Sequence, residues 1–129
     1  MGASTVNGTL ARCRVLVVED EYYLADDMAR ALANLGAEVV GPVPTCGEAL
    51  ALLGQGPGFD AAVLDINLRG EAVYPLADVL AARGIPFVFA TGYDQSAVAA
   101  SHQGVPRWEK PFDPDQLARA LPTLMRGLV

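Results

Sequence analysis

Continuous apolar runs alternate with amphipathic stretches along this chain, and that alternation limits the folds open to it. A strand buried on both faces of a parallel sheet reads as an unbroken apolar run, and segments 14–18 and 85–90 have this character. Shorter apolar stretches lie between and after them. The pattern predicts five strands, at residues 14–18, 38–41, 60–64, 85–90 and 106–109.

Helical segments fill the intervals between these strands. Apolar residues recur at helical spacing from Leu24 to Leu35, and Gly36 follows as a stop signal. Thr45 and Glu48 form a capping-box pattern that opens a second helix. The pattern predicts helices at about 24–35, 46–53, 74–83, 95–102 and 114–125.

The last predicted helix carries both a start signal and an internal breaker. Asp113 is a suitable N-cap, and Pro114 is a suitable first helical residue. Pro122 lies inside the same helix, where its ring and its missing N–H should kink or shorten the last turn.

Strands that alternate with helices predict an α/β domain with three layers, α/β/α. The default architecture is a doubly wound, five-stranded parallel sheet, and we take the flavodoxin-like strand order 2-1-3-4-5. The 129 residues are enough for one domain. We expect a flexible leader at 1–12 and a single domain at 13–129, with no output domain.

Composition excludes several classes of protein. A net charge of −6 gives no basic footprint for nucleic acid, and no stretch approaches the roughly 20 apolar residues of a membrane span. The first residues do not resemble a signal peptide, so a cytoplasmic location is expected. Cys13 and Cys46 are expected to be reduced thiols, although sequence leaves a disulfide open.

Acidic residues follow two of the predicted strands. Glu19 and Asp20 close the first strand and Asp65 closes the third, so neighbouring strands would bring three carboxylates to one edge of the sheet. Their mutual repulsion calls for positive charge, which Mg²⁺ and the chain's only lysine, Lys110, could supply. Thr91, after the fourth strand, could offer a hydroxyl to a phosphoryl oxygen. The set indicates phosphoryl transfer to a carboxylate.

Each of these residues alone has a more ordinary explanation. Acids after a strand often stabilise the N-terminus of the next helix, and a single aspartate there is commonly a turn residue. Their joint occurrence at the ends of four predicted strands makes coincidence the poorer account. Pro111, after Lys110, could adopt a cis peptide that aims the lysine.

With these residues in view, the chain resembles the receiver domain of two-component response regulators. The resemblance extends from about Arg14 to Met125. Four stretches carry it: Val15-Leu16-Val17-Val18-Glu19-Asp20-Glu21, Leu64-Asp65-Ile66-Asn67-Leu68, Ala90-Thr91-Gly92 and Lys110-Pro111-Phe112.

The resemblance implies a role for each matching residue. Asp65 would be the phosphoacceptor, and Thr91 and Lys110 would bind phosphoryl oxygens. Mg²⁺, which Mn²⁺ could replace, would be held by three residues. These are Asp20 directly, Glu19 through a water, and Asn67 through its backbone carbonyl.

The resemblance also implies a signalling phosphoprotein of bacteria. A sensor histidine kinase or a histidine phosphotransfer protein would donate the phosphoryl group. The domain would catalyse only its own phosphorylation and slow dephosphorylation, so it would not be an enzyme for a separate substrate. It would relay or drain phosphate, or bind a partner when phosphorylated.

The segment Phe89-Ala90-Thr91-Gly92-Tyr93 resembles the signature of a receiver subgroup that often lacks output domains. Kinases of the HWE/HisKA2 type commonly serve that subgroup. We hypothesise that the predicted helix at 95–102 orders on phosphorylation and carries the signal. Tyr93 and Asn67 are expected to guard the mouth of the site and tune the lifetime of the phosphoryl group.

The chain departs from most receivers at the usual switch aromatic. Arg107 occupies the position three residues before the lysine, and Trp108 is next to it. The departure puts the usual aromatic rotation in doubt and leaves Arg107, Trp108 and Tyr93 as candidate switch or tuning residues.

Three alternatives to a phosphorylated receiver remain at this point. A metal-dependent phosphohydrolase of the haloacid-dehalogenase kind would need an acid two residues after Asp65, where Asn67 stands. A receiver-like module could bind partners without phosphorylation. A flavodoxin-like flavin carrier fits the fold, but no phosphate loop follows the first strand.

Overall fold

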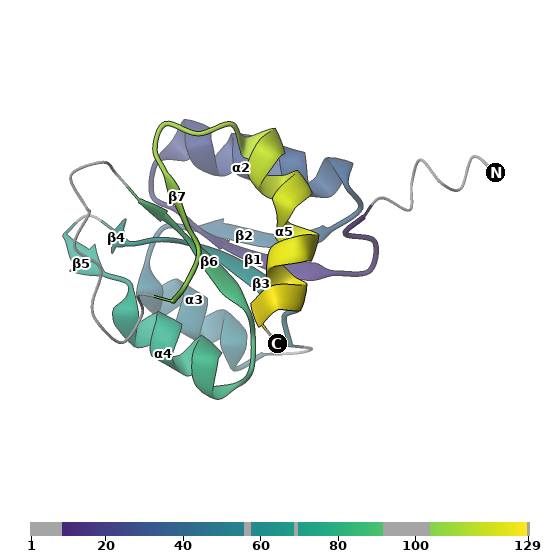
Figure 1. Cartoon of the computed structure of the whole chain (residues 1–129). Coiled ribbons are helices and arrows are strands. Elements are labelled where there is room, and N and C mark those ends of the chain that lie inside the picture. Colours follow the sequence, from purple (N-terminus) through teal and green to yellow (C-terminus); the bar gives the residue numbers. More distant parts are fainter. Residues whose placement is uncertain (1–8, 56–57, 69, 92–103, 129) are drawn as a thin grey trace.

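A computed structural model gives the structure of the chain and describes residues 9–55, 58–68, 70–91 and 104–128. Its centre is a parallel sheet of five strands in the order β2-β1-β3-β6-β7 (Figure 1). This order confirms the flavodoxin-like architecture predicted from sequence. The strands are β1 (Arg14–Val18), β2 (Glu38–Val43), β3 (Ala61–Asp65), β6 (Phe87–Thr91) and β7 (Arg107–Glu109).

Helices cover both faces of this sheet. One face carries α2 (Tyr22–Asn34) and α5 (Pro114–Leu128), which pack against each other (Figure 1). The other face carries α3 (Cys46–Leu53) and α4 (Tyr74–Ala82). The helix predicted at 95–102 lies outside the described residues. The described elements therefore form three layers, as predicted.

Alternate residues of the central strands point to opposite layers. Leu16, Val18 and Leu64 belong to the core beneath α3 and α4. Val17 and Val63 belong to the core beneath α2 and α5. Both faces of β1 and β3 are therefore buried, which explains why these strands are unbroken apolar runs in the sequence.

The predicted helix signals at two N-termini are confirmed. The Thr45 hydroxyl oxygen accepts a hydrogen bond from the Glu48 N–H at 3.1 Å. The Asp113 carboxylate accepts one from the Asp115 N–H at 2.9 Å, ahead of α5. These side chains satisfy backbone donors that a first helical turn leaves unpaired.

Pro122 was predicted to kink or shorten the last turn of its helix, and the shortening does not occur. Helix α5 continues through Pro122 and ends at Leu128. Leu117, Ala118 and Leu121, on its buried face, pack into the core shared with α2. Tertiary packing of this face maintains the helix past a residue that, taken alone, would end it.

Sequence reasoning also missed structure in two places. The short strands β4 (Asn67–Leu68) and β5 (Glu71–Ala72) pair as an antiparallel hairpin after β3, and Gly70 between them has a positive φ of 88°. Leu10 was assigned to the flexible leader, yet its side chain is fully buried and its N–H donates to the Leu35 carbonyl at 2.9 Å.

The structure also describes the two cysteines and the lengths of the apolar helices. Cys13 and Cys46 are both free thiols, as expected. Within the described part of the chain, no helix is both long enough and apolar enough to cross a membrane.

Candidate functional site

The three acids predicted to meet at the sheet edge do so in the structure. Glu19 and Asp20 directly follow β1, and Asp65 is the last residue of β3. The two strands are neighbours in parallel register, with Val18 opposite Leu64. Carboxylate oxygens from the three acids all lie within 4.8 Å of one another. We call Glu19, Asp20 and Asp65 the acidic cluster.

Burial makes the acidic cluster electrostatically unusual. Glu19 and Asp65 are each only 5% exposed, and Asp20 is half-buried. Burial, followed by the charge of Asp65, raises the pKa of Glu19 to about 7. Burial also raises the pKa of Asp65. Two crowded carboxylates removed from water hold protons more tightly, which is the condition a bound cation would relieve.

Lys110 brings a positive charge to two of these acids. Its ammonium nitrogen lies 3.1 Å from Glu19 Oε2 and 3.3 Å from Asp65 Oδ2. Burial on its own would lower the pKa of Lys110, but the charges of Glu19 and Asp65 outweigh it and raise that pKa. The lysine therefore stays protonated and ties the ends of β1 and β3 together.

The backbone around Lys110 fixes its place at the edge of the sheet. Its N–H donates to the Thr91 carbonyl at 2.6 Å, which joins it to the end of β6. The Lys110–Pro111 peptide is cis, as the sequence had led us to consider. A contact that the sequence did not predict is with Glu21, whose Oε1 lies 3.8 Å from the ammonium nitrogen.

Thr91 and Asn67 flank the acidic cluster. Thr91 is buried at the end of β6, and its neighbour Ala90 is in register with Asp65. The Asn67 N–H donates to Asp65 Oδ1 at 3.2 Å, and the Asn67 side-chain oxygen accepts from the Gly70 N–H at 2.8 Å. The hairpin thus orients the Asp65 carboxylate through the backbone of Asn67.

Two of the three candidate switch residues lie on β7. Arg107 is exposed, whereas Trp108 is half-buried and meets the Phe112 ring edge-on at a centroid distance of 6.1 Å. Trp108 packs into the core beneath α2 and α5. Tyr93 lies outside the described residues.

The donor atoms of the acidic cluster fit a hard divalent cation. Carboxylate oxygens are the ligands that Mg²⁺ prefers, and Mg²⁺ takes one or two of them while keeping several waters. A cavity of about 300 Å³ opens beside Glu19 and Asp20, between Tyr22 and Asp26 of α2 on one side and Pro42, near the end of β2, on the other. The site can therefore be reached from solvent.

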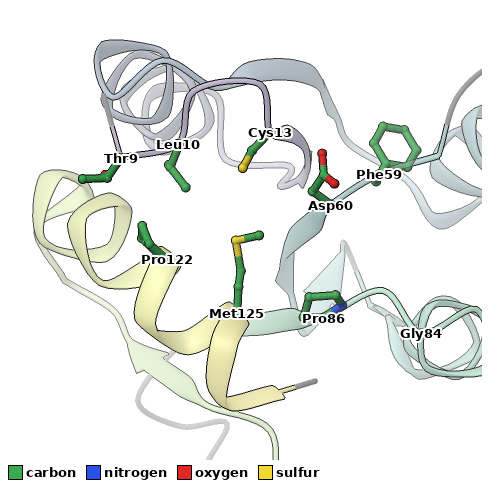
Figure 2. Close-up of a pocket in the computed structure, with 9 residues that line it drawn as sticks. All are labelled: Thr9, Leu10, Cys13, Phe59, Asp60, Gly84, Pro86, Pro122 and Met125. Carbon is green, nitrogen blue, oxygen red and sulfur yellow. The ribbon is translucent and has the colours of Figure 1, made fainter. Parts of the chain in front are cut away.

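A second cavity, of about 450 Å³, lies at the opposite edge of the sheet (Figure 2). Cys13, Asp60 and Pro86 in its wall directly precede β1, β3 and β6, and Met125 of α5 projects toward Cys13. No residue of the acidic cluster lines it. Because Glu19 and Asp20 line the smaller cavity, we place the candidate site there.

Comparisons with known proteins show a likeness to several solved structures. No protein-family model matches the chain, and no curated protein matches it. Among solved structures, SdrG from Sphingomonas melonis Fr1 is 45% identical over 88% of this chain and 96% of its own, with a TM-score of 0.76.

Two further structures extend the likeness. The response regulator PhyR from Brucella abortus is 26% identical over 95% of this chain, with a TM-score of 0.76, and this chain spans 51% of its length. The receiver domain of Francisella response regulator 1452 is 19% identical over 92% of this chain and 100% of its own, with a TM-score of 0.73, which shows the shared fold.

Proposed function

Because the chain belongs to the family of response regulator receiver domains, we propose that it accepts a phosphoryl group on Asp65 and signals in its phosphorylated form. The observation that carries this proposal is the position of Lys110. Its ammonium contacts Glu19 and Asp65, two members of the acidic cluster. Among the described residues, this cluster is the only group of three or more acids placed to bind a metal ion together. A nucleophilic carboxylate, a lysine and a set of hard ligands are what phosphoryl transfer to aspartate needs.

The proposed reaction transfers the phosphoryl group from a histidine to Asp65. A carboxylate oxygen of Asp65 attacks phosphorus, forming a P–O bond while the P–N bond to the donor's imidazole breaks. The bonding electron pair goes to the imidazole nitrogen. Lys110 and the Thr91 hydroxyl bind oxygens of the arriving group. The ammonium thereby exchanges a carboxylate partner for the phosphoryl group and stabilises the negative charge of that group.

Three residues would hold the metal in this reaction. Asp20 would bind it directly, Glu19 through a water, and Asn67 through its backbone carbonyl. When bound, Mg²⁺ supplies positive charge that offsets the negative charges of the acidic cluster and of the phosphoryl oxygens. The same residues support slow loss of the phosphoryl group to water, and no separate substrate is turned over.

The proposed donor is a sensor histidine kinase or a histidine phosphotransfer protein. PhyR, with which this chain shares its fold, is a response regulator. The Phe89 to Tyr93 signature favours a kinase of the HWE/HisKA2 type and a cytoplasmic, bacterial setting. The phosphorylated domain would bind a protein partner or serve as a phosphate relay or sink.

The test is phosphorylation by a small donor. The protein is incubated with Mg²⁺ and acetyl phosphate, and its intact mass is measured beside that of Asp65→Asn. We expect one labile phosphoryl group on the parent and none on the variant, with loss of labelling when EDTA removes the metal. Full labelling of Asp65→Asn would show that another residue is the acceptor.

A parent that stays unlabelled by acetyl phosphate is next given a phosphorylated histidine phosphotransfer protein. Failure with both donors would contradict the proposal and leave a receiver-like module that binds partners without phosphorylation. Steady release of phosphate from a small phosphate ester would instead identify a phosphohydrolase.

A further inference from the structure

Lys110 contacts three carboxylates, and they differ in what a metal would do to them. Glu19 and Asp65 belong to the acidic cluster, whereas Glu21, 3.8 Å from the ammonium nitrogen, does not. A divalent cation at the cluster would offset the negative charges of Glu19 and Asp65 and would repel the ammonium, so the attraction of these two acids for Lys110 would weaken. Glu21 is the one contacting carboxylate that would remain available to Lys110.

The backbone holds Glu21 at this position. Its N–H donates to Glu19 Oε2 at 3.1 Å, and its carbonyl accepts from the Ala25 N–H at 2.9 Å in the first turn of α2. Glu21 is the N-cap residue of α2, yet its side chain makes no capping hydrogen bond. The carboxylate is therefore turned to Lys110 instead of to the start of its own helix.

We propose that Glu21 is a positioning residue, which holds the Lys110 ammonium beside the acidic cluster when a divalent cation occupies that cluster. The inference rests on the proposed function, because it assumes a metal at the cluster. An ammonium held by Glu21 is already close to the site when the phosphoryl group arrives. The Lys110 side chain then loses less conformational entropy during the reaction, which lowers the barrier. Glu21 acts through Lys110 and touches neither the metal nor the phosphoryl group.

The chain provides its own reporter for this contact. Lys110 is the only lysine, so protein labelled with ¹³C,¹⁵N-lysine gives a single set of lysine side-chain NMR signals. With saturating Mg²⁺, we expect restricted motion of the Lys110 side chain in the parent and free motion in Glu21→Gln. Without metal, both proteins should show restricted motion, because Glu19 and Asp65 then hold the ammonium.

Asp26→Asn is the matched control. Asp26 lines the same 300 Å³ cavity as Glu19 and Asp20, but its carboxylate pairs with Arg30 at 2.8 Å. Its substitution removes a similar nearby charge and should leave the Lys110 signals as in the parent. Equal effects from Asp26→Asn and Glu21→Gln would overturn the inference, as would no effect of Glu21→Gln with Mg²⁺ bound.

Phosphorylation rates give a second readout. Glu21→Gln should slow labelling by acetyl phosphate about two- to fivefold, the size expected for an exposed ion pair. The same substitution should have no further effect in a Lys110→Ala background, because the partner is gone. An undiminished effect there would show that Glu21 acts by its charge alone.

The two readouts separate this inference from the proposed function. If the Lys110 signals respond as expected but the parent accepts no phosphoryl group, the role of Glu21 in positioning Lys110 is supported and the proposed function is contradicted. If the parent accepts a phosphoryl group but the Lys110 signals are unaffected by Glu21→Gln, the proposed function is supported and the role of Glu21 in positioning Lys110 is contradicted.

Discussion

Glu19, Asp65 and Lys110 show how single residues set the properties of the site. The two carboxylates are nearly buried, and the raised pKa of each reflects the cost of charging it away from water. One ammonium between them offsets part of that cost. Any change that lowers the negative charge of the cluster, such as a bound proton or cation, should therefore stabilise it.

Asp65→Asn is expected to stabilise the metal-free protein. The amide is nearly the same shape as the carboxylate, it can still accept from the Asn67 N–H, and Lys110 remains paired with Glu19. Removing one of three crowded acids should raise the melting temperature by about 3–6 °C, or about 1 kcal/mol. Thermal unfolding in EDTA measures this, and a lower melting temperature for the variant would contradict it.

The stability of the metal-free protein should depend on pH through Glu19. Its pKa is raised from 4.5 in the unfolded chain to about 7 in the folded one, so the folded protein binds more protons between these values. Stability is therefore expected to fall as pH rises from about 4.5 to 7. Urea unfolding across this range should show the decline in the parent and a flatter profile in Glu19→Gln. A parent profile as flat as that of the variant would contradict the assignment.

At the scale of elements, sequence signals located most of the helices and strands but not how far each runs. Helix α2 ends before Gly36, and α3 begins at its predicted cap, because these signals act within one turn. Helix α5 passes through Pro122 because contacts with α2, remote in sequence, stabilise its buried face. The β4–β5 hairpin was missed because each strand has two residues, too few to show alternation.

Pro122→Ala is expected to stabilise the domain. Proline leaves the Ala118 carbonyl without its usual helical donor, and alanine restores the N–H. The gain should be about 1–2 kcal/mol, below the roughly 3 kcal/mol difference in helix propensity, since packing at the 450 Å³ cavity is lost. Urea unfolding tests this beside Gln116→Ala, an exposed change in the same helix that should have little effect. A destabilised Pro122→Ala would show that the ring's packing outweighs the missing hydrogen bond.

At the scale of the whole molecule, the acidic cluster links metal binding to folding. The cluster exists only when β1 and β3 are paired, because its members come from residues 19, 20 and 65. A cation that binds the folded chain and not the unfolded one stabilises the fold in proportion to the logarithm of its concentration.

Mg²⁺ is therefore expected to raise the melting temperature, with a shift that grows with concentration and disappears on addition of EDTA. At a concentration about 100 times the dissociation constant, the gain should approach about 2.7 kcal/mol. Asp20→Asn should lose most of the shift, whereas Asp26→Asn, in the exposed pair with Arg30, should keep it. A shift equal in Asp20→Asn and the parent would place the metal elsewhere.

The fold class and the residues that meet at one edge of the sheet follow from local patterns in the sequence: apolar runs buried on both faces, and polar residues where each strand ends. The strand order was taken from the default topology of doubly wound sheets, and the structure confirmed it. The tertiary structure alone decided the packing of Leu10, the length of α5 past Pro122 and the approach of Glu21 to Lys110. These depend on side chains brought together from distant segments, whose distances and burial no local pattern records.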